Sequence, residues 1–381
     1  MKLICEKEQC TGCGLCAARC PKHCISLVAE ELGHLYPSVD QEKCIDCGLC
    51  QKACPSLHDI PGLYPSAAYA AWSKDEEDYR SCTSGGMASV LTRYFLTHGG
   101  VVYGCTVMPG IEIKHIRIDN FKDAYKLKGS KYVQSSIVDV LPQIGQDVKD
   151  GTNVLFIGTP CQVAAVKRMY KEQPDNLFLV DLICHGVPSN KWLVDYISKY
   201  LKIDTNKVSL VKFRDANSYK LSIYSNMLLI YQSKSLWEYR YYEDLYINTF
   251  FDCFTNRDSC FKCHYAKPER ISDVTIGDFW GLGNETDDKY IPKHPYGISC
   301  VLPLTEKGKR LISIVKDKLN IYERPVTEAI NGNDQLKSPK KKNLRIRIFR
   351  RIYKLIGVDT AYRLCVGDKI VKHKIRKIIR G

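Results

Sequence analysis

The chain has 381 residues, 45% of them hydrophobic and 26% charged, a composition typical of a folded globular protein with more than one domain. Its formal net charge of +14 lies entirely in residues 337–381, which contain 16 Lys and Arg and 2 Asp and Glu. The rest of the chain is formally neutral and so does not resemble a nucleic-acid-binding core. No run of about 18 apolar residues and no signal-peptide pattern occurs, and the cysteine spacing requires reduced thiolates. We therefore expect a cytoplasmic protein that binds no nucleic acid.

Residues 1–60 contain one cysteine pattern twice, as CTGCGLCAARCP and, 34 residues later, as CIDCGLCQKACP. Both copies read C-x2-C-x2-C-x3-C-P, the spacing of bacterial ferredoxins that hold two [4Fe–4S] clusters. In such a run three thiolates bind one cluster and the fourth binds the other. The spacing therefore predicts two clusters with crossed ligands: Cys10, Cys13, Cys16 and Cys54 for the first, and Cys44, Cys47, Cys50 and Cys20 for the second.

Gly14 and Gly48 lie between the second and third ligands of the two copies, where a tight turn brings backbone N–H groups toward the cluster sulfides. Paired zinc knuckles and a disulfide scaffold are the alternatives. Zinc sites commonly show two separated cysteine pairs, so the doubled pattern favours iron–sulfur clusters.

The pattern after the first module, over residues 67–336, is mixed α and β. Its expected elements are a helix over Met87–His98, strands over 101–108, 112–118, 153–158 and 177–183, a helix from Cys161, a helix over 190–201 and a core-facing helix over Tyr239–Phe254. Strand-to-helix alternation predicts a sheet that is at least partly parallel, with ligand-binding loops at the carboxyl ends of its strands. The fold class is therefore α+β or α/β: a ferredoxin-like module at 1–60, a larger mixed domain at 67–336 that binds cofactors, and a basic helical tail at 337–381.

Four further cysteines occur where ligands are expected. Cys161 follows a strand and Thr159-Pro160, so it lies in the first turn of a helix, where the helix N-terminus stabilises a thiolate. Cys184 follows the next strand, and Cys260 and Cys263 form a C-x2-C pair. Together they would suffice for a third cluster, although a lone cysteine is commonly a packing residue and the pair alone could bind zinc.

The motifs GTPCQ, CHGVPS, C-x2-C and SDVTIGDFWG, in this order, resemble those of the coenzyme F420 hydrogenase/dehydrogenase beta-subunit family. The resemblance covers residues 67–336 and implies a body that binds FAD and moves electrons between a flavin and a redox carrier, either a ferredoxin or a deazaflavin coenzyme. It also implies that Cys161, Cys184, Cys260 and Cys263 hold a third [4Fe–4S] cluster, with Cys253 as the competing ligand. The fused ferredoxin departs from the methanogen pattern, and members with such modules are associated with surface-polysaccharide biosynthesis.

A flavin site must be built without a G-x-G-x-x-G fingerprint or a phosphate loop, because the chain contains neither. Ser84, Gly85 and Gly86 open the first helix of the body, where exposed N–H groups can hold a pyrophosphate, with an ordinary helix start as the alternative. The segment LKGSKYVQSS is similar to the family's SKYVQS segment. This implies flavin contacts from Lys128, Ser130, Lys131, Tyr132 and Gln134.

Charged residues and histidines adjoin the proposed ligands. Arg270, Asp273 and Asp278 belong to the motif after the C-x2-C pair, where they are expected to tune a cluster or orient a cofactor unless they form an ordinary surface turn. His185 and His264 are next to ligand cysteines and, with Asp278, are the catalytic candidates for proton transfer to a flavin. Hydrogen bonding to a ligand is the alternative role of the two histidines.

The tail over residues 337–381 places Leu344, Ile348, Ile352 and Leu355 on one helical face among many bases. It predicts a basic amphipathic helix that binds an acidic partner or the anionic inner surface of a membrane, and packing on the body is the alternative. The whole sequence predicts a flavin-dependent iron–sulfur oxidoreductase. A non-catalytic electron-transfer subunit, with iron but no flavin, and a zinc-stabilised scaffold are the alternatives.

Overall fold

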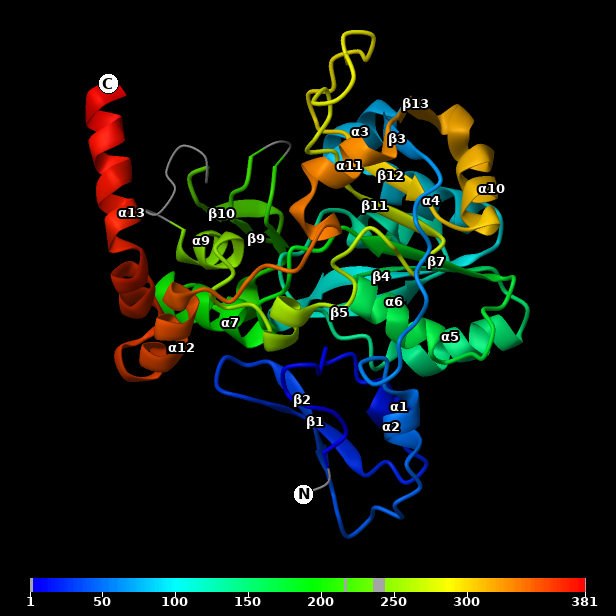
Figure 1. Cartoon of the computed structure of the whole chain (residues 1–381), viewed down its shortest axis with the longest axis horizontal. Helices are drawn as coiled ribbons and strands as arrows, with labels where there is room; N and C mark the ends of the chain where they lie inside the picture. Colours follow the sequence, from blue (N-terminus) through cyan, green and yellow to red (C-terminus); the bar gives the residue numbers. More distant parts are fainter. Residues whose placement is uncertain (1–2, 216–217, 236–243, 381) are drawn as a thin grey trace.

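The computed structural model describes residues 3–215, 218–235 and 244–380. Its first four elements form a small N-terminal lobe, drawn in blue below the rest of the chain in Figure 1. These elements are α1 (Leu15–Ala18), β1 (Ile25–Ala29), β2 (Leu35–Val39) and α2 (Leu49–Ala53). α1 and α2 each follow a glycine with positive φ, 74° at Gly14 and 69° at Gly48, so the sequence repeat folds into the same turn and helix twice.

The body is built on a mixed sheet of eight strands in the order β13-β3-β12-β11-β7-β6-β4-β5. The strands β4, β6, β7 and β11 pair in parallel, and antiparallel strands extend the sheet on both sides. The bounds are β3 Ala68–Ser73, β4 Val101–Met108, β5 Glu112–Ile118, β6 Val154–Gly158, β7 Leu177–Leu182, β11 Val274–Asp278, β12 Ser299–Pro303 and β13 Leu319–Arg324. The parallel centre confirms the partly parallel sheet that the strand-to-helix alternation predicted.

Helices cover both faces of this sheet. α4 (Met87–Thr97) and α10 (Glu306–Val315) pack on one face, and α5 (Val140–Lys149) and α6 (Pro160–Lys167) pack on the other. Within β6, Leu155 joins the first of these cores while its neighbours Val154 and Phe156 join the second, the alternation expected of a strand buried on both sides. α3 (Glu76–Ser81) and α11 (Val326–Gly332) lie near β3.

A third hydrophobic core lies beside the sheet and holds the tail. It combines α7 (Asn190–Asp195), a three-stranded sheet of β8 (Leu210–Lys212), β9 (Ser222–Ser225) and β10 (Leu228–Gln232), and the helices α9 (Leu245–Phe251), α12 (Leu344–Ile356) and α13 (Val358–Arg380). Phe254 makes edge contacts with Phe349 and Tyr362 at ring-centroid distances of 5.1 Å each. The tail therefore packs on the body along one face (Figure 1).

Most elements expected from the sequence are present. α4 and the first two strands of the parallel region confirm their predictions to within one residue, and the helix expected over 190–201 is α7 continued by one π-helical turn, Tyr196–Tyr200. Of the helix expected over Tyr239–Phe254, residues 239–243 lie outside the described part, and the rest contains the buried α9. The tail forms two helices, because Gly357 between them has φ 80° and ψ 161°, a conformation that side chains disfavour. Among the described helices, none has the length and apolar character needed to cross a membrane.

Candidate functional site

The eight N-terminal cysteines form two groups in the lobe, with the crossed membership that the spacing predicted. Cys10, Cys13, Cys16 and Cys54 line one small cavity, called here the inner site. Cys20, Cys44, Cys47 and Cys50 line another, called here the outer site. In both groups three sulfurs come from one repeat and the fourth comes from the other.

The two sites differ in their surroundings. At the inner site, a Cβ atom on Gly14 would lie 2.3 Å from Val138 Cγ2 of the body, whereas a Cβ on the equivalent Gly48 of the outer site would meet nothing within 4 Å. Cys47 of the outer site is exposed. The inner site therefore faces the body, and the outer site faces solvent.

A third group of cysteines lies at the carboxyl ends of β6 and β7. Cys161 is in the first turn of α6, its Sγ 3.2 Å from Thr159 Oγ1, and Cys184 follows β7 and accepts a hydrogen bond from Gly186 N at 3.4 Å. The C-x2-C pair completes the group that we call the third site: Cys161, Cys184, Cys260 and Cys263. These four thiols influence one another's ionisation.

The donor set of the third site fits an iron–sulfur cluster. Burial raises the pKa of Cys161, Cys184 and Cys260 to about 12, and repulsion between neighbouring thiols adds to the effect. A bound metal centre reverses this balance, because it deprotonates a coordinating thiol outright. In the described part of the chain, no three His, Cys, Asp or Glu side chains are placed to hold a single metal ion. The assignment to clusters therefore depends on the number and type of the sulfur ligands.

The inner and third sites are neighbours across the contact between the lobe and the body. Cys13 of the inner site raises the pKa of Cys161, behind burial and nearer thiols. Buried Tyr265 lies between them: after burial, the main influences that raise its pKa are Cys161 and Cys13. Leu15 of α1 packs in the same hydrophobic core as Tyr265. A continuous packed region therefore joins the two sulfur groups.

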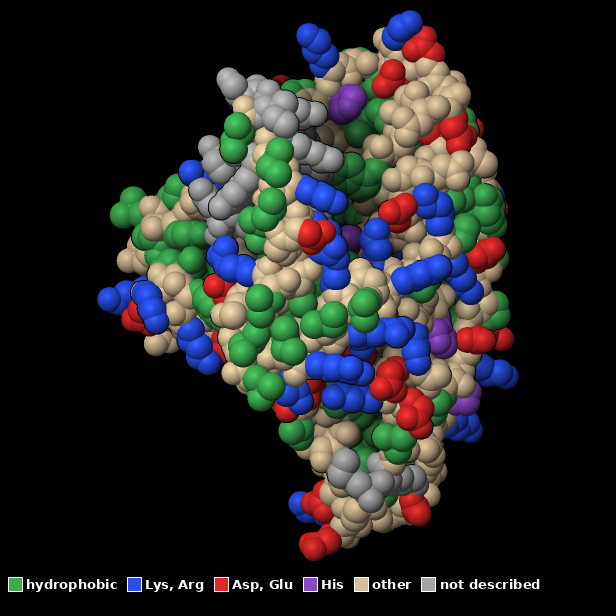
Figure 2. Space-filling view, turned by 60° about the vertical axis from the view of Figure 1, so that its left-hand side comes forward, with side chains coloured by type: hydrophobic (Ala, Val, Ile, Leu, Met, Phe, Trp, Pro, Cys, Tyr) green, Lys and Arg blue, Asp and Glu red, His purple; other side chains and the backbone are tan. Residues whose placement is uncertain are grey.

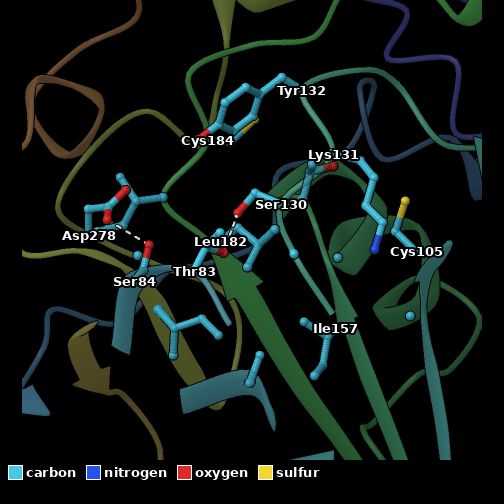
Figure 3. A pocket seen from close by; sticks show the side chains of 18 of the residues that line it. Thr83, Ser84, Cys105, Ser130, Lys131, Tyr132, Ile157, Leu182, Cys184 and Asp278 are labelled. Atoms are coloured by element: carbon cyan, nitrogen blue, oxygen red, sulfur yellow. Dashed lines mark hydrogen bonds between the residues drawn. The ribbon is translucent and has the colours of Figure 1, made fainter. Parts of the chain in front are cut away.

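A cavity of about 300 Å³ opens beside the third site at the carboxyl ends of β6, β7 and β11. Cys184 is part of its wall, together with residues from the start of α4 and from the loop after η3 (Phe121–Leu127) (Figure 3). Its volume is at the lower end of the range typical of small-molecule sites. The cavity and the third site therefore share a residue.

Several residues expected to contact a flavin line this cavity. Gly86, which caps α4 without a side chain, lines the cavity, and the first N–H of the helix, that of Met87, donates to Ser299 Oγ at 3.4 Å. Ser130 Oγ and Thr83 Oγ1 are 3.0 Å apart (Figure 3). Lys131 Nζ donates to the carbonyls of Leu127 and Lys128. Burial lowers the pKa of Lys131.

Other predicted contacts lie on the same wall. Lys128 Nζ forms an ion pair with Asp78 at 2.6 Å, and the ring of Tyr132 stacks on Phe250 at 4.7 Å with an interplanar angle of 4°. Gly85 has φ 80° and adjoins the cavity residues Ser84 and Gly86.

Asp278 forms a charged network at the end of β11. It accepts a hydrogen bond from Ser84 Oγ at 2.6 Å (Figure 3) and a bidentate contact from Arg214 Nη1 at 2.7 Å to each oxygen. Arg214 in turn lies over the ring of Tyr219, 4.9 Å from its centroid. The candidate catalytic carboxylate is therefore held by an arginine and directed toward the cavity.

His185 also lines the cavity, but both of its ring nitrogens are engaged. Nε2 is 3.1 Å from the carbonyl of Phe251, and Nδ1 is 2.9 Å from Gln335 Nε2. Burial lowers the pKa of His185, so its ring is neutral at pH 7. Cys253, the competing ligand, lies 3.4 Å from His185 Nε2, and the charged groups that act on it are Lys340 and Asp252 rather than the other thiols.

Four predicted site residues lie away from the cavity. Gln134 donates to Thr11 O of the lobe at 2.9 Å, and Arg270 forms a fully buried ion pair with Asp181 at 2.9 Å. Asp273 accepts hydrogen bonds within the body, from Leu179 N at 2.8 Å and from other side chains. His264 lies on the surface near Asp59.

The sequence reasoning missed several residues. Cys5 and Cys24 lie outside the repeated pattern, yet Cys5 lines the inner site and Cys24 lines the outer one, with its Sγ 3.3 Å from that of Cys20. The aromatic residues Tyr219, Phe250 and Trp280 line the cavity although the first two are also core residues. The repeated C-x2-C-x2-C-x3-C spacing was the only sequence pattern that indicated ligands of the first two sites, and Cys5 and Cys24 lie outside it.

Two family models match the chain. Residues 9–57 match a 4Fe-4S dicluster domain, and residues 151–329 match the C terminus of the coenzyme F420 hydrogenase/dehydrogenase beta subunit. No curated protein sequence matches. A solved structure of the F420-reducing [NiFe] hydrogenase complex from Methanosarcina barkeri, prepared with xenon, contains a similar chain with 20% identity, 73% of this chain and 92% of that chain covered, and a TM-score of 0.44.

The matches define an iron–sulfur electron-transfer protein. The two matches confirm, over residues 151–329 and 9–57, the resemblance to the coenzyme F420 hydrogenase/dehydrogenase beta subunit and to two-cluster ferredoxins that the motifs indicated.

Proposed function

We propose that this protein is a flavin-dependent iron–sulfur oxidoreductase that transfers electrons between an external one-electron carrier and a flavin in the cavity. The observation that supports it best is the order of the sites: outer, inner and third cysteine groups, then a cavity that includes Cys184 in its wall. A flavin exchanges one or two electrons, whereas an iron–sulfur cluster carries one, so the arrangement suits conversion between the two modes.

The outer site is the proposed contact point for the carrier. Cys47 is exposed there, and Ile45 and Leu49 beside it are exposed apolar side chains. A weak, short-lived electron-transfer contact requires only a small docking surface of this kind. A ferredoxin and a deazaflavin coenzyme are both consistent with such a surface, and reduction assays with each would tell them apart.

The flavin is proposed to lie against the start of α4 and the Lys128–Tyr132 segment. The positive end of a helix and nearby lysines suit a pyrophosphate, and the flat rings of Tyr132 and Tyr219 suit an isoalloxazine. The role we propose for Asp278 is to accept a hydrogen bond from the bound ring. His185, fixed by two hydrogen bonds, is proposed to position the loop of Cys184.

The test is anaerobic purification followed by iron, sulfide and flavin analysis. We expect iron for three [4Fe–4S] clusters and one flavin per chain. The variant Lys131→Met should retain flavin at least tenfold more weakly, because it removes a buried charge from the cavity, while Lys126→Met, an exposed control paired with Asp123, should bind normally. Full iron without flavin would replace this proposal with the non-catalytic electron-transfer subunit, and a colourless zinc protein would contradict both.

We also propose that the tail contacts an anionic membrane surface, which would suit a role in surface-polysaccharide biosynthesis. Its buried face packs on the body, but Leu344, Ile348 and Leu355 stay exposed, Leu355 at 84%. Figure 2 shows basic and hydrophobic side chains together on the side where the tail comes forward. Flotation with phosphatidylglycerol vesicles should be lost in Leu355→Asp and kept in Leu228→Asp, an exposed control on β10; equal flotation of both would contradict the proposal.

A further inference from the structure

Arg257 is a buried arginine at the contact between the lobe and the body, and it reaches a cluster ligand. Only 1% of it is exposed. Its Nε donates to the carbonyl of Cys10 at 2.6 Å, and its Nη2 donates to Cys10 Sγ at 3.5 Å and to the carbonyl of Leu35 at 2.7 Å. A residue of the body therefore places a positive charge directly on a sulfur of the inner site.

No carboxylate in the described part of the chain forms an ion pair with Arg257. Its remaining contacts are neutral: Gln134 Oε1 at 3.3 Å and the ring of Tyr36, 4.1 Å from the guanidinium carbon. A buried charge without an opposite charge is strongly unfavourable. The sulfur of Cys10, a thiolate when it binds a cluster, is the anion that Arg257 contacts.

The sequence repeat makes room for this arginine in one copy only. A Cβ on Gly12 would lie 2.6 Å from Arg257 Nη1, and Gly12 has φ +67°. The equivalent position of the outer copy is Asp46, an exposed acidic residue. Lys22 also lines the outer site, but it is exposed, so water and salt screen its charge.

We propose that Arg257 makes the inner cluster a better electron acceptor than the outer one, so that electrons from a one-electron donor protein move inward. Reduction adds one negative charge to a cluster, and a buried guanidinium on its ligand stabilises that charge. One electron leaves the outer site and one arrives at the inner site, so the transfer is balanced. The inference rests on the cluster part of the proposed function and is independent of the flavin.

The experiment is an EPR-monitored redox titration of the full-length holoprotein. In Arg257→Gln, one midpoint should fall by an amount equivalent to at least a tenfold change in the electron equilibrium, about 59 mV for a one-electron couple, while the others stay unchanged. The iron and sulfide content of the wild type shows separately whether the clusters are present. Unchanged midpoints in a variant with full iron would overturn the proposal.

Two further variants separate charge from structure. Gln134→Glu places a carboxylate against Arg257 with almost no change in shape, so it should lower the same midpoint potential. If Arg257→Gln loses iron, the midpoint of Gln134→Glu tests the role of the charge instead. Arg350→Gln removes another arginine that holds the same loop, through the carbonyls of Phe254 and Asn256, without touching Cys10. Its midpoint potentials should shift by an amount equivalent to less than a twofold change in the electron equilibrium. A fall as large as that in Arg257→Gln would overturn the proposal.

Discussion

The inner and outer sites of the N-terminal lobe carry the same cysteine spacing in two different environments. Cys10 and Cys54 of the inner site are buried and in reach of the body, whereas Cys47 of the outer site is exposed. The repeat supplies the ligands in both cases, and the residues around the ligands determine what each site contacts. Duplication therefore leaves one copy available to an external partner while the other copy joins the body.

The largest effect that separates the two sites should come from removal of one ligand from each. Cys13→Ala and Cys47→Ala should each lose about a third of the bound iron, since three clusters are proposed. Cys13 packs against the hydrophobic core that Leu15 and Tyr265 share, so we expect its loss to loosen the lobe from the body as well. Limited proteolysis should release the lobe in Cys13→Ala only.

The comparison needs both variants measured for iron, sulfide and protease sensitivity under anaerobic conditions. Wild-type protein treated with an iron chelator serves as the reference for complete cluster loss. Equal release of the lobe from Cys13→Ala and Cys47→Ala would show that the inner cluster does not support the contact with the body.

A smaller difference is expected from alanine at the equivalent glycines. Gly14 and Gly48 have nearly the same φ, 74° and 69°, so both substitutions share a backbone cost of about 1–2 kcal/mol. Only Gly14→Ala adds a clash, with Val138 Cγ2 at 2.3 Å, which should cost roughly 1–3 kcal/mol more. Urea unfolding of the two variants measures that difference, and equal stabilities would mean that the lobe does not press on the body at Gly14.

Local ligand spacing made most of the metal sites predictable from the sequence. Three thiolates of each cluster lie within seven residues of one another, and the third site uses the ends of two adjacent parallel strands. Such features need no knowledge of distant contacts. The start of α4 was predicted from its glycines and the Lys128–Tyr132 segment from its resemblance to the family, and residues of both line the cavity.

Contacts between the lobe and the body were beyond the reach of the sequence. Gln134 looked like a flavin contact because its segment resembles the family, yet its amide reaches Thr11, 123 residues away. Arg270 belongs to the motif after the C-x2-C pair but forms its ion pair with Asp181 inside the sheet, and Arg257 belongs to none of the motifs. The contacts of Gln134 and Arg257 depend on how the lobe and the body meet, and the ion pair of Arg270 depends on how two distant segments of the body pack. Hydrophobic periodicity encodes neither.

The smallest predicted effect is a pH dependence that belongs to the inner side of the lobe. His34 is buried against the body, with Nε2 3.0 Å from the carbonyl of Thr255 and Nδ1 without a hydrogen-bond partner. Burial, and then the charge of Arg257, lowers the pKa of His34 to about 3 from an ordinary 6.5. The folded state thus keeps the ring neutral, while the unfolded chain binds a proton below pH 6.5.

The contribution of His34 to the free energy of unfolding is therefore complete above pH 6.5. It is lost as the pH falls below that value, by up to about 1.4 kcal/mol per pH unit. Between pH 7.5 and 5.5, the free energy of unfolding, measured in urea, should fall by about 1.4 kcal/mol less in His34→Gln than in the wild type. His23→Gln, at an exposed position of the same lobe, is the matched control and should keep the wild-type slope. If both variants kept it, the lobe would not bury His34 in solution, and the inner site would be as open to water as the outer one.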